Sequence, residues 1–380
     1  MNFIDLAEQQ RHIRTKIDAR IAAVLDHGNY IMGPEVKELE TQLADFVGAK
    51  HCLSCANGTD ALLIALMALG VTAGDAVFVP SFTFASTAEV VPLVGATIVL
   101  VDIDPRTYNM DPESLKRCIA LVKSEGLKPA VVIPVDLFGL PADYNEIIPI
   151  AAENNMKVIS DSAQAFGATL DGKSPCLVAD ITTTSFFPAK PLGCYGDGGA
   201  LFTENEELAA LINSLRVHGK GTEKYDNVRV GMNSRLDTVQ AAILLEKLAV
   251  YPQELVSRQQ AAEAYTEALA DKFVVPHVPE NATSVWAQYT LAAATQEERK
   301  AVMDGAKSQG VPTMIYYPKP LHEQVAYKDC MIDPKGAENS CRAAQTVFSI
   351  PMHGYLTSDE IEKVIKSVGF NYFLSEVKET

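Results

Sequence analysis

The sequence predicts an α/β fold with a mainly parallel sheet, followed by a smaller α+β region. Up to about residue 205, short apolar runs alternate with segments of helical spacing, which is typical of right-handed βαβ units. Beyond Pro252 the pattern changes, and a helix, strands and a last helix are expected. The length of 380 residues exceeds the usual limit of one hydrophobic core and favours two domains, which we place at residues 1–250 and 251–380.

The predicted elements follow in chain order. Residues 3–26 place apolar side chains at helical spacing and end at His27-Gly28, which predicts an N-terminal helix. The alternating region predicts strands at 76–80, 97–101, 130–135 and 157–160, with helices near 59–69, 84–93, 112–122 and 144–154. A long helix over 236–250 is expected to lead out of the large domain. The small domain is predicted to hold a helix at 258–269, strands near 284–292 and 346–350, and a helix at 358–368.

The composition disfavours several classes of partner and site. A net charge of −16 argues against nucleic acid and anionic membranes, because both require basic patches. No apolar run approaches a membrane span and the charged N-terminus is not a signal peptide, so we expect a cytoplasmic protein. Seven scattered cysteines indicate reduced thiols. Because Cys52-Leu-Ser-Cys55 lacks a second Cys or His pair, no metal site is expected.

One lysine lies in a setting suited to covalent chemistry. Lys190 falls between two apparent strands, in the apolar and small-residue stretch Phe186-Phe-Pro-Ala-Lys-Pro-Leu-Gly. Burial disfavours the ammonium form, so the amine becomes a nucleophile for an aldehyde, as Schiff-base chemistry requires. Taken alone, such a lysine is more often a surface residue of a loop, and only its companions change that interpretation.

Two upstream segments are these companions. Asp161 follows the run Lys157-Val-Ile-Ser, at the carboxyl end of a predicted strand where α/β sheets bind ligands. There its carboxylate can hold a pyridine nitrogen protonated, or it caps the next turn. Asn57-Gly-Thr-Asp leads from a turn into a helix. The N–H groups of that helix N-terminus and the Thr59 hydroxyl suit a phosphate dianion, or they simply cap the helix.

In the order and spacing of these three segments, the chain resembles the DegT/DnrJ/EryC1/StrS family of sugar aminotransferases. The members of this family are fold type I enzymes that depend on pyridoxal 5'-phosphate (PLP). The resemblance covers essentially the whole chain. Its motifs, jointly specific, are Tyr30-Ile-Met-Gly-Pro-Glu, Ala56-Asn-Gly-Thr-Asp-Ala-Leu, Pro80-Ser-Phe-Thr-Phe, Val101-Asp-Ile-Asp-Pro, Asp161-Ser-Ala-Gln-Ala-Phe-Gly-Ala, Ser185-Phe-Phe-Pro-Ala-Lys, Gly196-Asp-Gly-Gly-Ala and Asn233-Ser-Arg-Leu-Asp-Thr-Val-Gln-Ala-Ala. A dehydratase branch has histidine in place of the lysine, and Lys190 argues against that branch.

The resemblance implies a role for each matching residue. Lys190 would bind PLP as a Schiff base and shuttle protons, and Asp161 would pair with the pyridine nitrogen. The other cofactor contacts would be Gln164 by the ring and its 3-hydroxyl, Phe84 stacked on the ring, Gly58, Thr59 and Ser185 on the phosphate, and Asn233 on the neighbouring subunit's cofactor. L-glutamate as amino donor, a nucleotide-linked keto sugar as acceptor and a homodimer with shared active sites are implied in the same way.

The resemblance also indicates the substrate. Phe187-Pro-Ala-Lys-Pro-Leu-Gly-Cys-Tyr-Gly-Asp-Gly-Gly and Arg229-Val-Gly-Met-Asn-Ser-Arg are most similar to enzymes that aminate C3 of a UDP-linked 2-acetamido-3-keto uronate for bacterial surface polysaccharides, lipopolysaccharide O-antigen among them. Arg229 would bind the uronate carboxylate, or it lies at the surface or dimer interface. In Tyr316-Tyr-Pro-Lys-Pro-Leu-His a tyrosine stands where the uronate enzymes lead us to expect His-Tyr. This keeps C4 amination of a UDP-linked 4-keto-6-deoxy-N-acetylhexosamine open, and the predicted substrate contacts are Arg229, Tyr316, Tyr317 and His322.

Two other classes of protein compete with this hypothesis. A Rossmann oxidoreductase is disfavoured because no G-x-G-x-x-G follows the first strand. A non-catalytic PLP-binding regulator is disfavoured because Lys190, Asp161 and Gln164 are all present and no DNA-binding extension is apparent.

Overall fold

The computed structural model describes residues 1–223 and 225–369, and an eight-stranded sheet forms its centre. The strand order is β1-β8-β7-β5-β4-β2-β3-β11. From β7 to β11 all neighbours are parallel, whereas β8 runs antiparallel to both β1 and β7. The predicted, mainly parallel sheet is therefore confirmed. Its strands are β1 (His51–Cys55), β2 (Asp75–Pro80), β3 (Thr97–Val101), β4 (Lys128–Val132), β5 (Lys157–Asp161), β7 (Ile181–Ser185), β8 (Gly199–Thr203) and β11 (Met331–Ile332).

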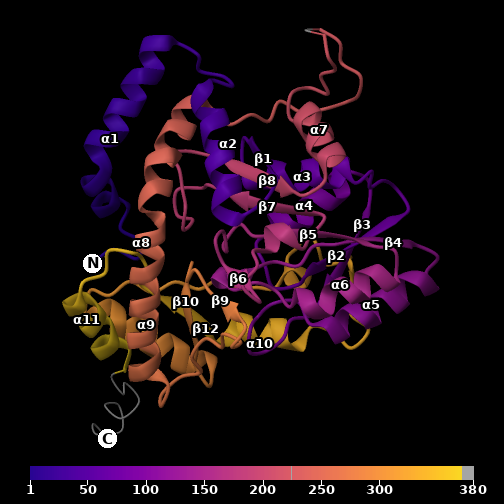
Figure 1. Ribbon diagram of the computed structural model, residues 1–380. Helices are drawn as coiled ribbons and strands as arrows, with labels where there is room; N and C mark the ends of the chain where they lie inside the picture. Colours follow the sequence, from indigo (N-terminus) through magenta and orange to yellow (C-terminus); the bar gives the residue numbers. More distant parts are fainter. Residues whose placement is uncertain (224, 370–380) are drawn as a thin grey trace, which may run out of the picture.

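Both faces of the sheet are covered by helices, which explains the continuous apolar runs of its strands. In β2, Val77 and Val79 pack on one side with α3 (Gly58–Ala68) and α4 (Ser86–Leu93). Ala76 and Phe78 point to the other side and pack with α5 (Pro112–Ser124) and α6 (Tyr144–Glu153). The sheet is thus the middle layer of three (Figure 1), and its carboxyl-terminal edge is where loops from neighbouring strands meet.

The helix α8 is one continuous element of 32 residues, Thr238–Leu269 (Figure 1). The prediction of two helices separated near Pro252 is wrong. A proline inside a helix removes one backbone hydrogen bond and crowds the preceding turn, but Tyr251 before Pro252 and Glu254 after it are both buried and hold the helix in place. Residue 250, the predicted domain limit, lies within α8. The amino-terminal half of α8 packs against α1 (Leu6–His27) and α2 (Pro34–Val47).

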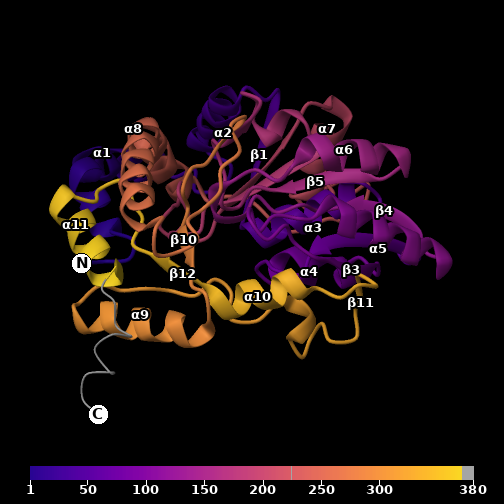
Figure 2. The ribbon, with the colours of Figure 1, turned by 90° about the horizontal axis from the view of Figure 1, so that it is seen from below.

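The C-terminal region combines a small sheet with helices and also returns to the large sheet (Figure 2). β10 (Tyr289–Ala292) pairs antiparallel with β12 (Val347–Ile350). Their apolar side chains pack with the end of α8 and with α9 (Gln296–Ser308) and α11 (Ser358–Gly369). The connection between α9 and β12 contains α10 (Glu338–Thr346) and β11, which pairs parallel with β3 at the edge of the large sheet. The remaining short pair is β6 (Thr169–Leu170) with β9 (Ala282–Thr283), and three short 3-10 turns are η1 (Leu137–Gly139), η2 (Pro175–Leu177) and η3 (Leu321–Glu323). Within the described residues, none of the helices is both long and apolar enough to cross a bilayer.

His353, which follows β12, makes the stability of this fold dependent on pH. The side chain is 4% exposed, and its Nδ1 accepts the N–H of Tyr355 at 3.3 Å, which requires a neutral ring. Burial and the nearby Arg258 charge lower the pKa of His353 from 6.5 to about 4. The unfolded chain therefore binds a proton between these two values that the folded chain does not, so folding stability falls as the pH falls from 6.5 towards 4.

We expect His353→Gln to flatten this dependence. The wild type should lose roughly 3 kcal/mol of unfolding free energy to this group between pH 6.5 and pH 4, and the variant, which has no titrating ring, should not. Urea unfolding at a series of pH values measures the difference. His277→Gln, at an exposed histidine, is the matched control, and an unchanged slope in His353→Gln would contradict the assignment.

Candidate active site

A cavity of about 600 Å³ opens at the carboxyl-terminal edge of the large sheet. Its walls come from the segments that follow β1, β2, β4, β5 and β7, together with residues of the C-terminal region. This is the edge at which ligands of open α/β sheets bind. Nine of the predicted site residues line this cavity: Gly58, Thr59, Phe84, Asp161, Gln164, Ser185, Lys190, Tyr316 and Tyr317.

Lys190 lies in the loop between the antiparallel strands β7 and β8. The loop is closed by backbone bonds from Phe186 N–H to Gly198 O at 2.7 Å and from Cys194 N–H to Phe186 O at 2.8 Å. Its tight turn also bonds Lys190 N–H to Phe187 O at 2.8 Å. Burial lowers the pKa of the Lys190 amine, while the negative charge of Asp161 acts in the opposite direction. The loop backbone is therefore fixed and places the Lys190 amine in a partly desolvated wall, as a nucleophile for an aldehyde requires.

Asp161 is the last residue of β5 and is 6% exposed. The Thr87 hydroxyl donates to its Oδ2 at 2.8 Å, and the N–H of Ala163 donates to its Oδ1 at 3.2 Å. Burial raises the pKa of Asp161, while these two donors and the charge of Lys190 lower it. A fixed carboxylate on the cavity wall can accept a further hydrogen bond from a protonated ring nitrogen.

Behind Asp161 lies Asp136, a residue that the sequence analysis did not single out. It is completely buried, and its carboxylate accepts four hydrogen bonds. Ala142 N–H and the Tyr144 hydroxyl both donate to Oδ1 at 2.8 Å, while the hydroxyls of Ser160, at 3.0 Å, and Ser162 donate to Oδ2. Because these serines flank Asp161, Asp136 fixes the end of β5. Burial raises the pKa of Asp136 to about 6. The sequence did contain a signal for Asp136, because this residue directly follows a predicted strand, as Asp161 does.

The N-terminus of α3 forms an anion cradle on the same wall. Asn57 caps the helix by accepting the N–H of Asp60 at 2.8 Å, which leaves the N–H groups of Gly58 and Thr59 without an intrahelical partner. A Cβ at Gly58 would lie 2.8 Å from the Ser185 Cβ, so only glycine allows the helix to approach Ser185 this closely. The cradle thus offers the hydroxyls of Thr59 and Ser185, the N–H groups of Gly58 and Thr59, and the positive end of the helix dipole. These groups suit a phosphate dianion.

Gln164, Tyr317 and Phe84 complete the wall. Gln164 Oε1 accepts the N–H of Phe138 at 2.8 Å, and its Nε2 donates to the Tyr317 hydroxyl at 3.1 Å. The rings of Phe84 and Tyr317 have centroids 6.3 Å apart, and Phe84 is 58% exposed. An exposed aromatic face in a cavity is suited to stacking on a flat heteroaromatic ligand. These features match the groups of PLP one by one. The Lys190 amine suits its aldehyde and the Asp161 carboxylate suits its pyridine nitrogen. The anion cradle at α3 suits its phosphate, and the Phe84 ring suits its aromatic ring.

Three predicted residues do not line this cavity. Arg229 and Asn233 are exposed, and their side chains bond locally, to the Ser214 hydroxyl and to Arg235 respectively. His322 Nδ1 lies 2.7 Å from the Ser81 hydroxyl, so its ring is held outside the cavity. Burial lowers the pKa of His322. Within one subunit, therefore, Arg229 and His322 lie apart from the cavity that the other predicted substrate contacts, Tyr316 and Tyr317, line.

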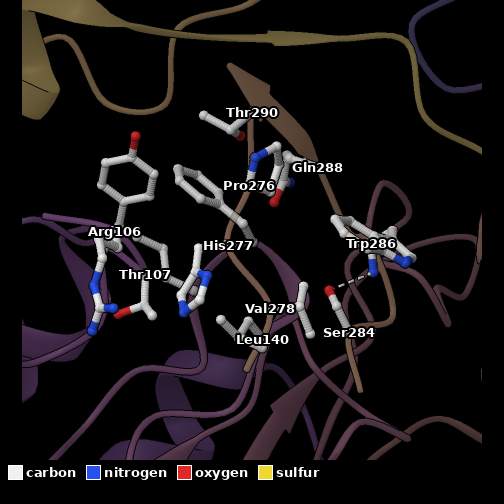
Figure 3. Close-up of a pocket in the computed structure, with 13 residues that line it drawn as sticks. Arg106, Thr107, Leu140, Pro276, His277, Val278, Ser284, Trp286, Gln288 and Thr290 are labelled. Atoms are coloured by element: carbon white, nitrogen blue, oxygen red, sulfur yellow. Dashed lines mark hydrogen bonds between the residues drawn. The ribbon is translucent and has the colours of Figure 1, made fainter. Parts of the chain in front are cut away.

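A smaller cavity lies next to the large one, and Gln288 lines both. Figure 3 shows it between Arg106 and Thr107 on one side and Trp286 on the other, with Pro276, His277 and Val278 across its centre. At the edge of this smaller cavity, the Ser284 hydroxyl accepts the backbone N–H of Trp286 at 3.1 Å. Its volume of about 20 Å³ is enough for roughly one water molecule. A cofactor and substrate therefore require the larger cavity.

Comparison with known proteins agrees with this site. Residues 11–369 match the model of the DegT/DnrJ/EryC1/StrS aminotransferase family. A UDP-2-acetamido-2-deoxy-3-oxo-D-glucuronate aminotransferase from Pseudomonas aeruginosa is 49% identical over 95% of this chain and 98% of its own. A DegT/DnrJ/EryC1/StrS aminotransferase from Brucella abortus superposes with a TM-score of 0.95 at 48% identity, over 97% of this chain and 98% of that one. NtdA from Bacillus subtilis, solved with the cofactor PMP, superposes with a TM-score of 0.85 at 28% identity, over 97% and 82% of the two chains.

PMP is the aminated form of PLP, so the cofactor of the relatives is the one that the cavity fits. The chain belongs to the DegT/DnrJ/EryC1/StrS family of PLP-dependent aminotransferases, with the fold of the type I PLP enzymes.

Proposed function

We propose that this aminotransferase moves an amino group from L-glutamate to C3 of a UDP-linked 2-acetamido-3-keto uronate, in the biosynthesis of a bacterial surface polysaccharide. The observation that carries the chemistry is the meeting of Lys190, Asp161 and the α3 N-terminus in one cavity. The support for the substrate is the similarity, at 49% identity along nearly the whole chain, to a relative named for a 3-oxo-glucuronate sugar.

Each residue has a chemical task in this proposal. PLP supplies the electron sink that stabilises negative charge at the substrate carbon. Asp161 holds the pyridine nitrogen protonated, and the α3 N-terminus holds the phosphate. The Lys190 amine, with its lowered pKa, takes a proton from one carbon and returns it to another, which is general acid–base work. Gln164 is fixed between Phe138 and Tyr317 and orients the ring edge.

Arg229 and Asn233 enter the proposal through a second subunit. Both are exposed near the end of the connection from α7 (Glu206–Leu215) to α8, and neither reaches its own cavity. We propose a homodimer in which Asn233 contacts the phosphate in the neighbouring cavity and Arg229 binds the uronate carboxylate there. A guanidinium forms two parallel hydrogen bonds with a carboxylate, which distinguishes a uronate from a 6-deoxy sugar. Seven unpaired cysteines support a reducing compartment, for which we propose the cytoplasm.

Tyr316 and Tyr317 favour a second candidate, C4 amination of a UDP-linked 4-keto-6-deoxy-N-acetylhexosamine. Both rings line the cavity, with centroids 6.1 Å apart, and neither carries a positive charge for a carboxylate. The two candidates share every step at the cofactor. They differ in the position of the keto group and in the charge of the sugar.

Amino transfer in the reverse direction separates the two candidates. We expect purified enzyme with PLP and 2-oxoglutarate to form glutamate from a UDP-linked 3-amino uronate, and at least tenfold more slowly from 4-amino-6-deoxy sugars linked to UDP or dTDP. Glutamate release is measured by a coupled dehydrogenase. If glutamate forms only from the 4-amino sugars, the 4-keto-6-deoxy sugar replaces the uronate as the proposed substrate. If no sugar yields glutamate, the proposal is overturned.

A further inference from the structure

Three potential metal ligands lie together outside the cofactor cavity. His322 and Glu323 belong to η3, and Cys341 belongs to α10. Cys341 Sγ lies 3.4 Å from His322 Nε2 and 3.5 Å from Glu323 Oε1, and one ligand atom from each residue falls within 4.8 Å of the other two. We propose that His322, Glu323 and Cys341 form a binding site for a zinc-like divalent cation, separate from the catalytic site.

The distances suit a tetrahedral ion. Zinc binds thiolate sulfur at about 2.3 Å and imidazole nitrogen or carboxylate oxygen at about 2.0–2.2 Å, so ligand atoms around one tetrahedral ion are about 3.3–3.6 Å apart. The nitrogen–sulfur and sulfur–oxygen separations already have this length. Glu323 is exposed, so its side chain is free to close the nitrogen–oxygen edge. Thiolate and imidazole ligands select zinc and its neighbours over magnesium and calcium.

The imidazole is oriented as a metal ligand. The Ser81 hydroxyl lies 2.7 Å from His322 Nδ1 and accepts its N–H in the tautomer that leaves the Nε2 lone pair towards Cys341. A hydrogen bond on the distal ring nitrogen is the usual support for a metal-bound histidine.

Both ligand-bearing segments are anchored to the large sheet. Leu321 N–H donates to Ser81 O at 2.7 Å, just after β2, which fixes the position of His322. Ser340 donates to Asp102 Oδ1 through its N–H at 2.9 Å and its hydroxyl at 2.7 Å, just after β3, which fixes Cys341. β2 and β3 are hydrogen-bonded neighbours, so the two anchors form one rigid unit. Ligands held on such a scaffold lose little freedom when they bind an ion.

The binding step balances in charge and protons. The Cys341 S–H bond breaks, an S–metal bond forms, and the proton leaves to solvent. One thiolate and one carboxylate then neutralise a divalent ion. A water molecule takes the fourth position on the exposed side at Glu323, as in zinc sites with three protein ligands.

The holoenzyme, freed of excess PLP, is dialysed to equilibrium against buffered micromolar zinc, and bound metal is measured by atomic absorption. We expect one zinc ion per chain. Cobalt(II) substitution should give intense d–d absorption in the red, outside the cofactor bands, as tetrahedral thiolate sites do. A wild-type enzyme that binds no stoichiometric zinc under these conditions overturns the proposal, whether or not it aminates a sugar.

Variants identify the ligands. Cys341→Ser and His322→Gln should each weaken binding at least tenfold, and Glu323→Gln should weaken it less. Cys330→Ser is the matched control, because Cys330 is the other partly exposed thiol, and it should bind as the wild type does. Circular dichroism verifies the fold, and if His322→Gln does not fold, the Cys341 and Glu323 variants decide. Retained binding in Cys341→Ser, or loss of binding in Cys330→Ser, contradicts the assignment.

Discussion

Lys190→Ala should lower turnover by at least about a thousandfold and abolish the violet absorption of the covalently bound cofactor. In the proposed mechanism, the variant loses both the amine that binds the aldehyde and the group that moves the proton. Its neighbours, Asp161 and the α3 N-terminus, remain, so PLP should still bind non-covalently and be lost on dialysis. Stopped assays of glutamate formation and the visible spectrum measure the two effects.

Two controls accompany this variant. Lys300→Ala removes a lysine of α9 that is exposed and paired with Asp304, and it should keep wild-type turnover and spectrum. Lys190→Arg restores a positive charge without a nucleophilic amine and should stay inactive. Multiple turnovers by Lys190→Ala, without added amine, would exclude the role assigned to this residue.

Asp161→Asn should lower turnover on the order of 10²–10³-fold, the usual cost of removing one preorganised electrostatic contact. An amide cannot stabilise a protonated pyridine nitrogen as a carboxylate does. Cofactor binding should persist, because the phosphate cradle and Lys190 are unchanged. The exchange of the glutamate Cα proton with deuterated water reports the affected step directly.

Asp136→Asn is the matched control for this change, since Asp136 is also a buried aspartate and lies in the segment that follows the parallel strand β4. The amide nitrogen would replace one carboxylate oxygen, so its N–H groups would face either the donors from Ala142 and Tyr144 or those from Ser160 and Ser162. We expect a loss of about 1–3 kcal/mol in unfolding free energy and less than a tenfold loss of turnover. If Asp136→Asn and Asp161→Asn reduced proton exchange equally, Asp161 would have no special place at the ring.

The grouping of Asp161, Ser185 and Gly58 at one edge of the sheet was predictable because its signals are local. Asp161 and Ser185 each end a strand, and the Gly58 turn opens a helix, so a parallel sheet brings them together at one edge. The sheet itself followed from apolar runs that are buried on both faces. The start of α2 also carried a local signal, Gly33-Pro34-Glu35 with proline at the first helical position, and the sequence analysis missed it.

Other features depend on contacts that no local pattern reveals. Tertiary packing carries α8 through Pro252, against its intrinsic propensity. β11 is only two residues long and is a strand because β3 lies beside it. The four donors of Asp136 come from two segments, one with Ala142 and Tyr144 and the other with Ser160 and Ser162. The hydrogen bond between the Ser81 hydroxyl and His322 Nδ1 joins residues 241 positions apart in the chain.

The continuity of α8 determines where this chain can be recombined with its relatives. A chimera joined at residue 250 would combine halves of one helix whose buried side chains, such as Leu248 and Tyr251, pack in the same cluster. Each parental half would then meet a surface that was selected for a different partner. A junction beyond Leu269 keeps the helix whole and beside α1 and α2, and it changes the partners only at the C-terminal end of α8, which packs with β10, α9 and α11. Chimeras that are meant to exchange acceptor specificity between family members are therefore best joined around residue 270, so that the whole of α8 comes from one parent.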